Sequence, residues 1–234
     1  MLSFLRKIPD LLFPPLCLSC GRALAIGVPL MCPECSALLG VRGGFVCSSC
    51  GKRVAEGKCH PGSISVFAGF SYESIPARRL IHALKYGGTE KAAATAARLI
   101  SPLLSQTIPR GAMPALLPIP LYPRRERERG FNQSGLFSEA LARELRKTGF
   151  RAAVFSNTLR RTRDTKSQTA CGTRKERALN VEGCFSAENR GLPENALVFL
   201  VDDVVTSGAT IEEAARALKK AGVPHVAGLA IAKT

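Results

Sequence analysis

Residues 196–210 of this chain read ALVFLVDDVVTSGAT and are the most informative segment for predicting its fold. A continuous apolar run leads into two consecutive acids, Asp202 and Asp203, and a loop of small residues then opens an amphipathic helix. An apolar run without alternation is typical of a strand buried on both faces of a parallel sheet. Ligands of such sheets bind beyond the carboxyl ends of the strands. The stretch therefore predicts an α/β fold with a binding site beside the two aspartates.

The loop after the aspartates has the composition of a phosphate site. Its residues, here called the phosphate loop, are small or carry hydroxyls: Thr206, Ser207, Gly208, Ala209 and Thr210. Backbone amides of such a loop and of the helix that follows converge on one point and suit a phosphate group. The glycine allows a positive φ and a close approach of the backbone. An aspartate pair that only caps the helix would leave the hydroxyl-rich loop unexplained.

Two acids followed by T-S-G-A-T after an apolar strand resemble the phosphoribosyl pyrophosphate loop of type I phosphoribosyltransferases. The resemblance implies that Asp202 and Asp203 bind the ribose hydroxyls and serve catalysis, and that the phosphate loop holds the 5-phosphate. It also implies Mg²⁺, bound together with phosphoribosyl pyrophosphate. No G-x-x-x-x-G-K-[ST] pattern occurs in the sequence, which argues against a nucleoside triphosphate hydrolase.

Alternating strand and helix patterns surround this motif. We expect strands at 63–72, 115–120, 196–203 and 225–234, and helices at 75–88, 90–106, 133–147 and 210–222, with Asn132 as the cap of the third helix. This order favours a mostly parallel sheet flanked by helices. We assign residues 63–234 to a phosphoribosyltransferase-like domain of the type I fold and residues 1–62 to a small cysteine-rich zinc-ribbon module.

The cysteines indicate a metal rather than disulfides. The chain has nine cysteines, and charges and prolines interrupt the apolar start MLSFLRKIPDLLFPPLC, which therefore does not read as an export signal. No run of eighteen apolar residues is present, so we expect no membrane insertion and a cytoplasmic protein. In a reducing compartment, thiols are poor candidates for structural disulfides, and metal binding becomes the better interpretation.

Two C-x-x-C pairs supply one tetrahedral set of structural Zn²⁺ ligands: Cys17, Cys20, Cys32 and Cys35. We expect about one zinc ion per chain, whose binding contributes folding free energy to a segment with little core. A second site stays open, because a third pair lacks a matching fourth and needs adjacent ligands: Cys47, Cys50, Cys59 and His60. Redox-active or merely buried cysteines are the alternative. Cys171 and Cys184 lie far away and are expected to be ordinary residues.

The segment LPIPLYPRRERERGFNQSGLFSEALA, residues 117–142, is rich in arginine. Together with the cysteine pairs and the phosphate loop, it resembles the competence protein F (ComF) family. HALKYGG at 82–88 and SQTACGTRKERALNVEGCF at 167–185 are similar to recurring segments of that family. The resemblance covers nearly the whole chain. It implies single-stranded DNA handling during DNA uptake, with a DNA translocase as a protein partner.

The arginine-rich segment follows a stiff Pro-Ile-Pro turn and suits a pyrophosphate. Arg125 and Arg129 are the candidates, because guanidinium groups make forked bonds to phosphate oxygens. Asn132 and Gln133 would orient this loop or a ligand. A solvated Arg-Glu-Arg-Glu-Arg run is the alternative. Lys85 is a further candidate, although a lysine near a helix end also favours the helix dipole without any ligand.

Residues 160–180 are polar, basic and weakly periodic, and we call them the hood segment. In transferases of this fold a flexible hood closes over the reaction centre and excludes water. We expect the segment to be mobile without ligand, with Lys166, Gln168 and Arg177 as anion contacts.

The charge of the chain points to a polyanionic partner. The net charge is +15, and residues 121–177 carry 15 Lys or Arg against 6 Asp or Glu. A basic surface that only aids solubility is the alternative. Three functions remain: phosphoribosyl transfer to an unknown acceptor, single-stranded DNA binding without catalysis, and zinc-dependent sensing of the nucleotide precursor. The low count of three Tyr and no Trp limits base stacking.

Overall fold

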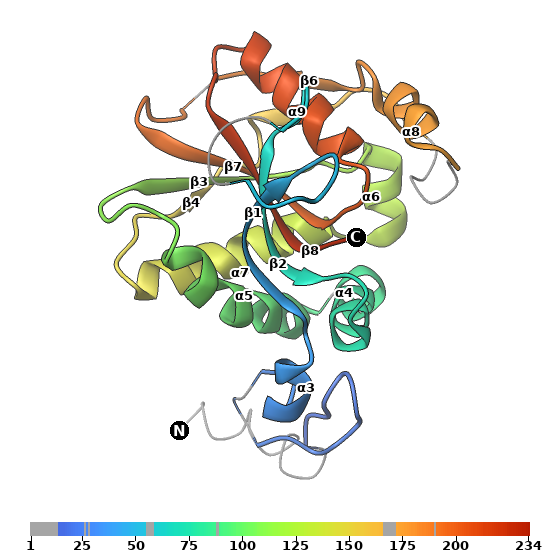
Figure 1. Ribbon diagram of the computed structural model, residues 1–234, viewed down its shortest axis with the longest axis vertical. Helices are drawn as coiled ribbons and strands as arrows, with labels where there is room; N and C mark the ends of the chain where they lie inside the picture. The colour runs from blue at the N-terminus through green and yellow to red at the C-terminus, as the bar shows by residue number, and fades with distance from the viewer. Residues whose placement is uncertain are drawn as a thin grey trace.

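The computed structural model describes residues 14–25, 27, 29–54, 59–87, 89–165, 172–189 and 191–234. Its centre is a six-stranded sheet in the order β1 (Val41–Cys47), β2 (Ser65–Ser71), β8 (Val226–Lys233), β7 (Ala196–Val205), β3 (Met113–Pro118) and β4 (Ala153–Val154). All neighbouring strands are parallel except β1, which pairs antiparallel with β2. The α/β fold with a mostly parallel sheet is confirmed (Figure 1).

Helices cover both faces of this sheet. α4 (Ile75–Gly87), α5 (Glu90–Ser105) and α7 (Gln133–Lys147) pack on one face, and α9 (Ala209–Lys220) packs on the other (Figure 1). Phe199 and Val201 of β7 belong to the first core, whereas Val198 and Leu200 belong to the second. Because successive side chains of a strand point to opposite faces, β7 must be apolar at every one of these positions.

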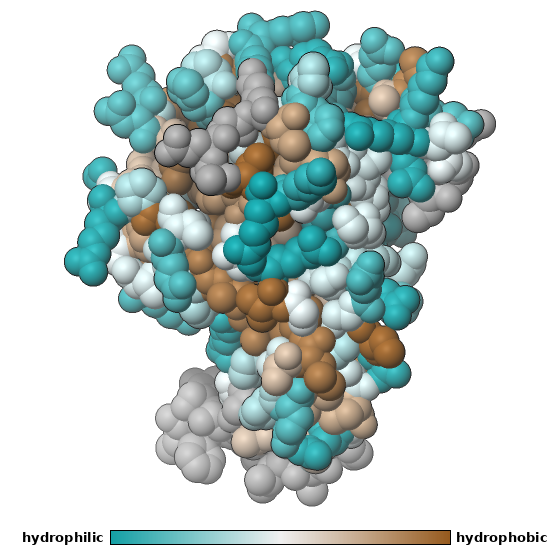
Figure 2. All heavy atoms as spheres, in the orientation of Figure 1, coloured by the Kyte–Doolittle hydropathy of each residue, from teal (hydrophilic) through white to brown (hydrophobic). Residues whose placement is uncertain are grey.

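The cysteine-rich segment is joined directly to the sheet. α3 (Pro33–Ala37) lies next to the start of β1 in Figure 1, and β1 itself falls within residues 1–62. The boundary at residue 62 remains a prediction. Figure 2 shows apolar side chains gathered over this connection. Leu38 and Val41, on either side of the start of β1, are exposed.

Two segments are more regular than their sequence suggests. The arginine run, expected to be a loop, forms α6 (Pro123–Arg129), with proline at its start and Gly130 at φ 80° after its end. The hood segment begins in β5 (Leu159–Arg161), which pairs with β6 (Phe185–Ala187), and ends in α8 (Arg174–Val181). A capping box at Thr173 and Glu176 stabilises α8. Lys166, Gln168 and Cys171 lie outside the described residues.

None of the helices built from the described residues combines the length and the apolarity that crossing a bilayer requires.

Candidate functional site

The phosphate loop connects the carboxyl end of β7 to the start of α9. Gly208 caps α9 with φ 83°, a left-handed conformation that side chains rarely adopt. A Cβ at this position would lie 2.7 Å from the backbone oxygen of Ser48. Both observations require glycine here, as the sequence predicts.

A cavity of about 360 Å³ opens at this end of the sheet. Its walls bring together residues from five separate parts of the chain. Besides residues 202–211, the charged and polar residues that line it are Tyr72, Lys85, Tyr86, Arg125, Arg129, Gln133 and Arg161. Lys85, Arg125 and Arg129 are therefore next to the loop, as expected from the sequence.

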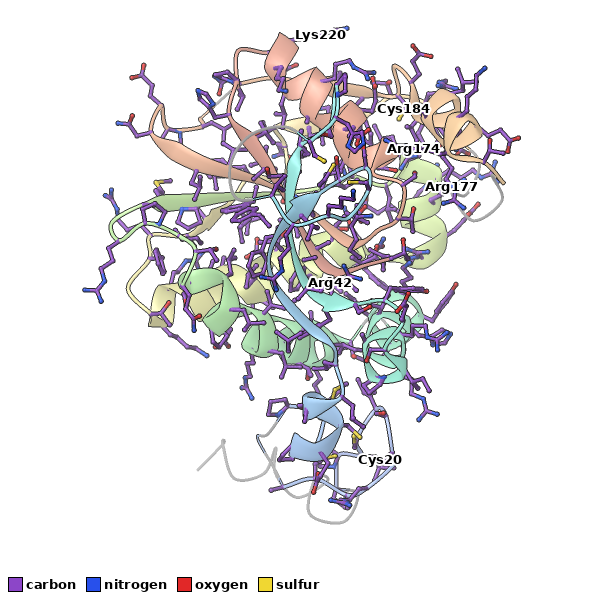
Figure 3. The ribbon with its side chains drawn as sticks, viewed as in Figure 1. Cys20, Arg42, Arg174, Arg177, Cys184 and Lys220 are labelled. Carbon is purple, nitrogen blue, oxygen red and sulfur yellow. The ribbon has the colours of Figure 1, made fainter. Side chains whose placement is uncertain are left out.

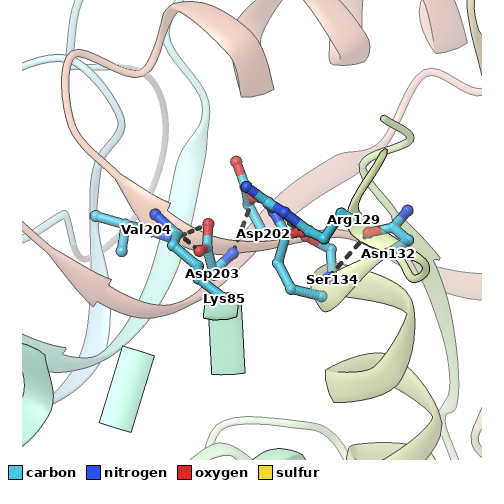
Figure 4. A network of polar contacts seen from close by, with 8 residues as sticks. Lys85, Arg129, Asn132, Ser134, Asp202, Asp203 and Val204 are labelled. Atoms are coloured by element: carbon cyan, nitrogen blue, oxygen red, sulfur yellow. Dashed lines mark hydrogen bonds and ion pairs between the residues drawn. The ribbon is translucent and has the colours of Figure 1, made fainter. Parts of the chain in front are cut away.

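The two aspartates form an acidic pair near the end of β7. Asp203 is buried, and its Oδ2 lies 3.0 Å from Nζ of Lys85 (Figure 4). Oδ1 of Asp202 accepts hydrogen bonds from the Ser134 hydroxyl at 3.2 Å and from the Asp203 amide at 2.9 Å. Burial, followed by the charge of Asp203, raises the pKa of Asp202 to about 7. Burial opposes the charge of Lys85, but the Asp203 carboxylate holds the Lys85 pKa above its ordinary value.

The start of α7 fixes the arginine wall of the cavity. Asn132 is confirmed as its cap, because its Oδ1 accepts from the amides of Ser134 at 3.0 Å and Gly135 at 3.3 Å. The Asn132 amide also donates to the Ile119 carbonyl at 3.1 Å, and Arg129 donates to Oε1 of Gln133 at 2.6 Å. The polar pair 132–133 thus orients the residues after β3, as expected.

Arg161 is a cavity residue that the sequence analysis did not single out. Its guanidinium group donates to the Thr165 hydroxyl at 2.5 Å and lies over the ring of Phe185, 5.4 Å from the centroid. Burial lowers its pKa, and its Nε has no hydrogen-bond partner among the described residues. Arg125 pairs with Asp164 at 3.4 Å beside it. In β5, Leu159 and Arg161 lie on the same, inward face, while Arg160 is exposed. The position of Arg161 two residues after an apolar leucine is the feature of the sequence that indicates this inward orientation.

Arg177 is not brought to the cavity. It lies on α8, close to Arg174 in Figure 3, and is absent from the residues that line the cavity walls. The described part of the hood segment reaches the cavity through Arg161 instead.

The cysteines form two compact clusters of potential metal ligands. The Sγ atoms of Cys17, Cys20, Cys32 and Cys35 all lie within 4.8 Å of one another, and so do the ligand atoms of Cys47, Cys50, Cys59 and His60. Adjacent ligands are compatible with one centre, because Nδ1 of His60 lies 3.6 Å from Cys47 Sγ while Cys59 Sγ lies 3.7 Å from Cys50 Sγ. Four thiolates, or three thiolates with one imidazole, fit tetrahedral zinc. Cys184 is buried in the apolar core, as expected of an ordinary residue.

This fold and this site define a phosphoribosyltransferase-type domain that carries a zinc ribbon. Residues 133–232 match the phosphoribosyl transferase domain family, and residues 8–63 match the double zinc ribbon domain family. This match and the two cysteine clusters together support structural zinc in the N-terminal segment.

The chain belongs to the ComF family. It is 32% identical over 215 residues to the DNA utilization protein YhgH of Salmonella typhi. The matched region covers 90% of this chain and 87% of that protein. Competence protein F of Haemophilus influenzae is 34% identical over 48% of this chain and 47% of its own length. Competence protein ComFC of Bacillus subtilis is 36% identical over 46% of this chain and 39% of its own length.

Proposed function

We propose that this protein binds phosphoribosyl pyrophosphate with Mg²⁺ and transfers its phosphoribosyl group to a nitrogen acceptor. The observation that carries the proposal is the meeting of an acidic pair, a phosphate loop and four cationic side chains around one cavity of about 360 Å³. The ligand has matching parts: two ribose hydroxyls, a monophosphate and a pyrophosphate.

Each part of the ligand has a partner of suitable chemistry. The amides and hydroxyls of the phosphate loop bind the 5-phosphate. Asp202 and Asp203 accept hydrogen bonds from the ribose hydroxyls. The pyrophosphate lies among the cationic side chains Lys85, Arg125, Arg129 and Arg161. The acidic pair also fits Mg²⁺, because carboxylates are hard oxygen donors, and the ion when bound would neutralise pyrophosphate charge.

The reaction follows from these contacts. A nitrogen lone pair forms a bond to the anomeric carbon while the carbon–oxygen bond to pyrophosphate breaks, and pyrophosphate leaves with that electron pair. The sugar becomes cation-like in the transition state. The carboxylates stabilise this positive charge, and the guanidinium groups stabilise the negative charge that grows on the leaving group. An effect of this kind requires groups that are already in place before the reaction.

Isothermal titration calorimetry with phosphoribosyl pyrophosphate and Mg²⁺ tests the binding. We expect one site per chain, lost when Asp202→Asn and Asp203→Asn are combined while the circular dichroism spectrum stays unchanged. Equal affinity in the double variant would overturn the site assignment. Pyrophosphate release with a panel of bases and amines then tests transfer and identifies the acceptor.

Single-stranded DNA binding is the second candidate, in the cytoplasm and alongside a DNA translocase. The names of the relatives, which mention competence and DNA utilization, favour it, as does the net charge of +15. α6 has no buried residue, and two of its arginines, Arg125 and Arg129, line the cavity. Affinity for an oligonucleotide should fall with salt, with a slope of about −0.7 per phosphate neutralised. A salt-independent affinity would count against this function.

A further inference from the structure

The second zinc cluster lies directly against the phosphate loop. Ser48 and Ser49, the two residues between Cys47 and Cys50, both donate hydroxyl hydrogen bonds to Oε1 of Glu212, at 2.6 and 2.8 Å. Glu212 stands in the first turn of α9, immediately after the loop. The backbone oxygen of Ser48 also fills the space where a side chain at position 208 would begin.

The turn that carries these serines is itself held firmly. Ser48 is fully buried, its amide donates to the Ile64 carbonyl at 3.0 Å, and its hydroxyl accepts from the Ile64 amide at 3.0 Å. These bonds tie the turn to the residue just before β2. The ligand-bearing turn thus connects the sheet to the loop, and metal binding at Cys47 and Cys50 would fix its shape.

The other side of the loop is held by a buried lysine. Nζ of Lys233 donates to the Thr206 carbonyl at 2.6 Å, and only 2% of this residue is exposed. A Cβ added to Gly51 would lie 3.6 Å from Cε of Lys233, so the lysine stem also runs along the zinc-bearing turn. The loop is therefore held at its start by Lys233 and after its end by Glu212.

The direction of the Glu212 carboxylate matters for an anion site. Glu212 does not appear among the residues that line the described cavity, although its neighbours Thr210 and Ile211 do. The hydroxyls of Ser48 and Ser49 both donate to Oε1 of Glu212 and so hold the carboxylate toward the turn between Cys47 and Cys50. Arg174 of α8 donates to the Ser49 hydroxyl as well, which ties the hood segment to the same turn.

We propose that Ser48, Ser49 and Glu212 are positioning residues that couple the second zinc site to the phosphate loop, so that the zinc-bearing turn sets the affinity for the 5-phosphate. This inference rests on the proposed phosphoribosyl pyrophosphate function. The first zinc site offers a comparison within the molecule, because Cys20 lies at the opposite end from Arg174 in Figure 3.

The test is calorimetry with phosphoribosyl pyrophosphate and Mg²⁺ on Ser49→Ala, on Glu212→Ala and on the Ser48→Ala plus Ser49→Ala pair. We expect each to weaken binding, by about tenfold for Glu212→Ala, because a freed or missing carboxylate leaves the loop unsupported. Glu212→Gln keeps an acceptor oxygen and should bind like wild type. Ser19→Ala, at the equivalent position of the first C-x-x-C pair, is the matched control and should also bind like wild type.

Hydrogen–deuterium exchange of residues 206–210 in the same variants supplies a readout that needs no ligand. We expect faster exchange there in Glu212→Ala and no change in α7. If wild type binds no phosphoribosyl pyrophosphate but Glu212→Ala still loosens the loop, the proposed function fails and the coupling stands. If wild type binds and Glu212→Ala neither loosens the loop nor lowers the affinity, the coupling is refuted and the function stands.

Discussion

Replacing Asp202 by Asn should make the unliganded protein more stable at alkaline pH although it removes a ligand contact. Asn keeps an oxygen that can accept from the Ser134 hydroxyl and from the Asp203 amide. The pKa of Asp202 rises from 3.8 to about 7, which is about 3 units. Each unit corresponds to about 1.4 kcal/mol, so ionised Asp202 lowers the free energy of unfolding by up to about 4 kcal/mol.

The pH window follows from the direction of this pKa shift. Between about pH 4 and pH 7 the unfolded chain binds fewer protons at Asp202 than the folded protein, so wild type loses stability as the pH rises. The Asn variant does not titrate at this position. The free energy of unfolding of the Asn variant, relative to that of wild type, should therefore increase by about 2–3 kcal/mol from pH 5 to pH 8.

Urea denaturation of both proteins at pH 5 and pH 8, with the same zinc content, measures this difference. Glu128→Gln is the control, because Glu128 is an exposed residue of α6 whose pairing with Arg124 is worth little. Its effect should stay within about 0.5 kcal/mol at both pH values. A stability difference between Asp202→Asn and wild type that does not change with pH would show that the pKa of Asp202 is not raised on folding.

Three further predictions follow from the geometry. Gly208→Ala should lower the free energy of unfolding by about 1–3 kcal/mol in urea denaturation, because of its positive φ and the Ser48 oxygen 2.7 Å from the new Cβ; unchanged stability would contradict the tight contact. Arg161→Ala should weaken pyrophosphate binding about tenfold in calorimetry while ribose 5-phosphate binding changes little; equal losses for both ligands would place Arg161 elsewhere. Because the structure brings a second set of ligands together, the expected zinc content rises from about one ion to two per chain, both needed for a stable N-terminal segment, and mass spectrometry of the native protein should find two; a stable, metal-free preparation would contradict the two clusters.

The core of the site could be predicted because its determinants are local. The apolar run of β7, the two aspartates and the phosphate loop are contiguous in the sequence. Their residue types directly indicate a buried strand, an acidic pair and an anion-binding loop. Asn132 is equally local, because a cap bonds to amides two and three positions along the chain.

Other parts depend on contacts between distant segments. The strand β1 is hard to recognise in the sequence, because Gly43 and Gly44 and a register shift between Val41 and Gly44 interrupt the alternation of apolar and polar residues. Arg161 reaches the cavity only because β5 pairs with β6, more than twenty residues later. The second metal cluster requires the chain to turn so that adjacent Cys59 and His60 face one centre, and spacing alone leaves that open.

Phosphorus NMR of phosphoribosyl pyrophosphate, titrated with the protein in the presence of Mg²⁺, shows whether the phosphate loop and the arginine wall bind the same molecule. We expect the 5-phosphate resonance to shift and broaden together with the two pyrophosphate resonances, because the phosphate loop and the arginine wall bind opposite ends of one molecule. A response confined to the pyrophosphate resonances, with the 5-phosphate unchanged, would mean that the basic wall captures polyanions and that the phosphate loop holds no sugar phosphate.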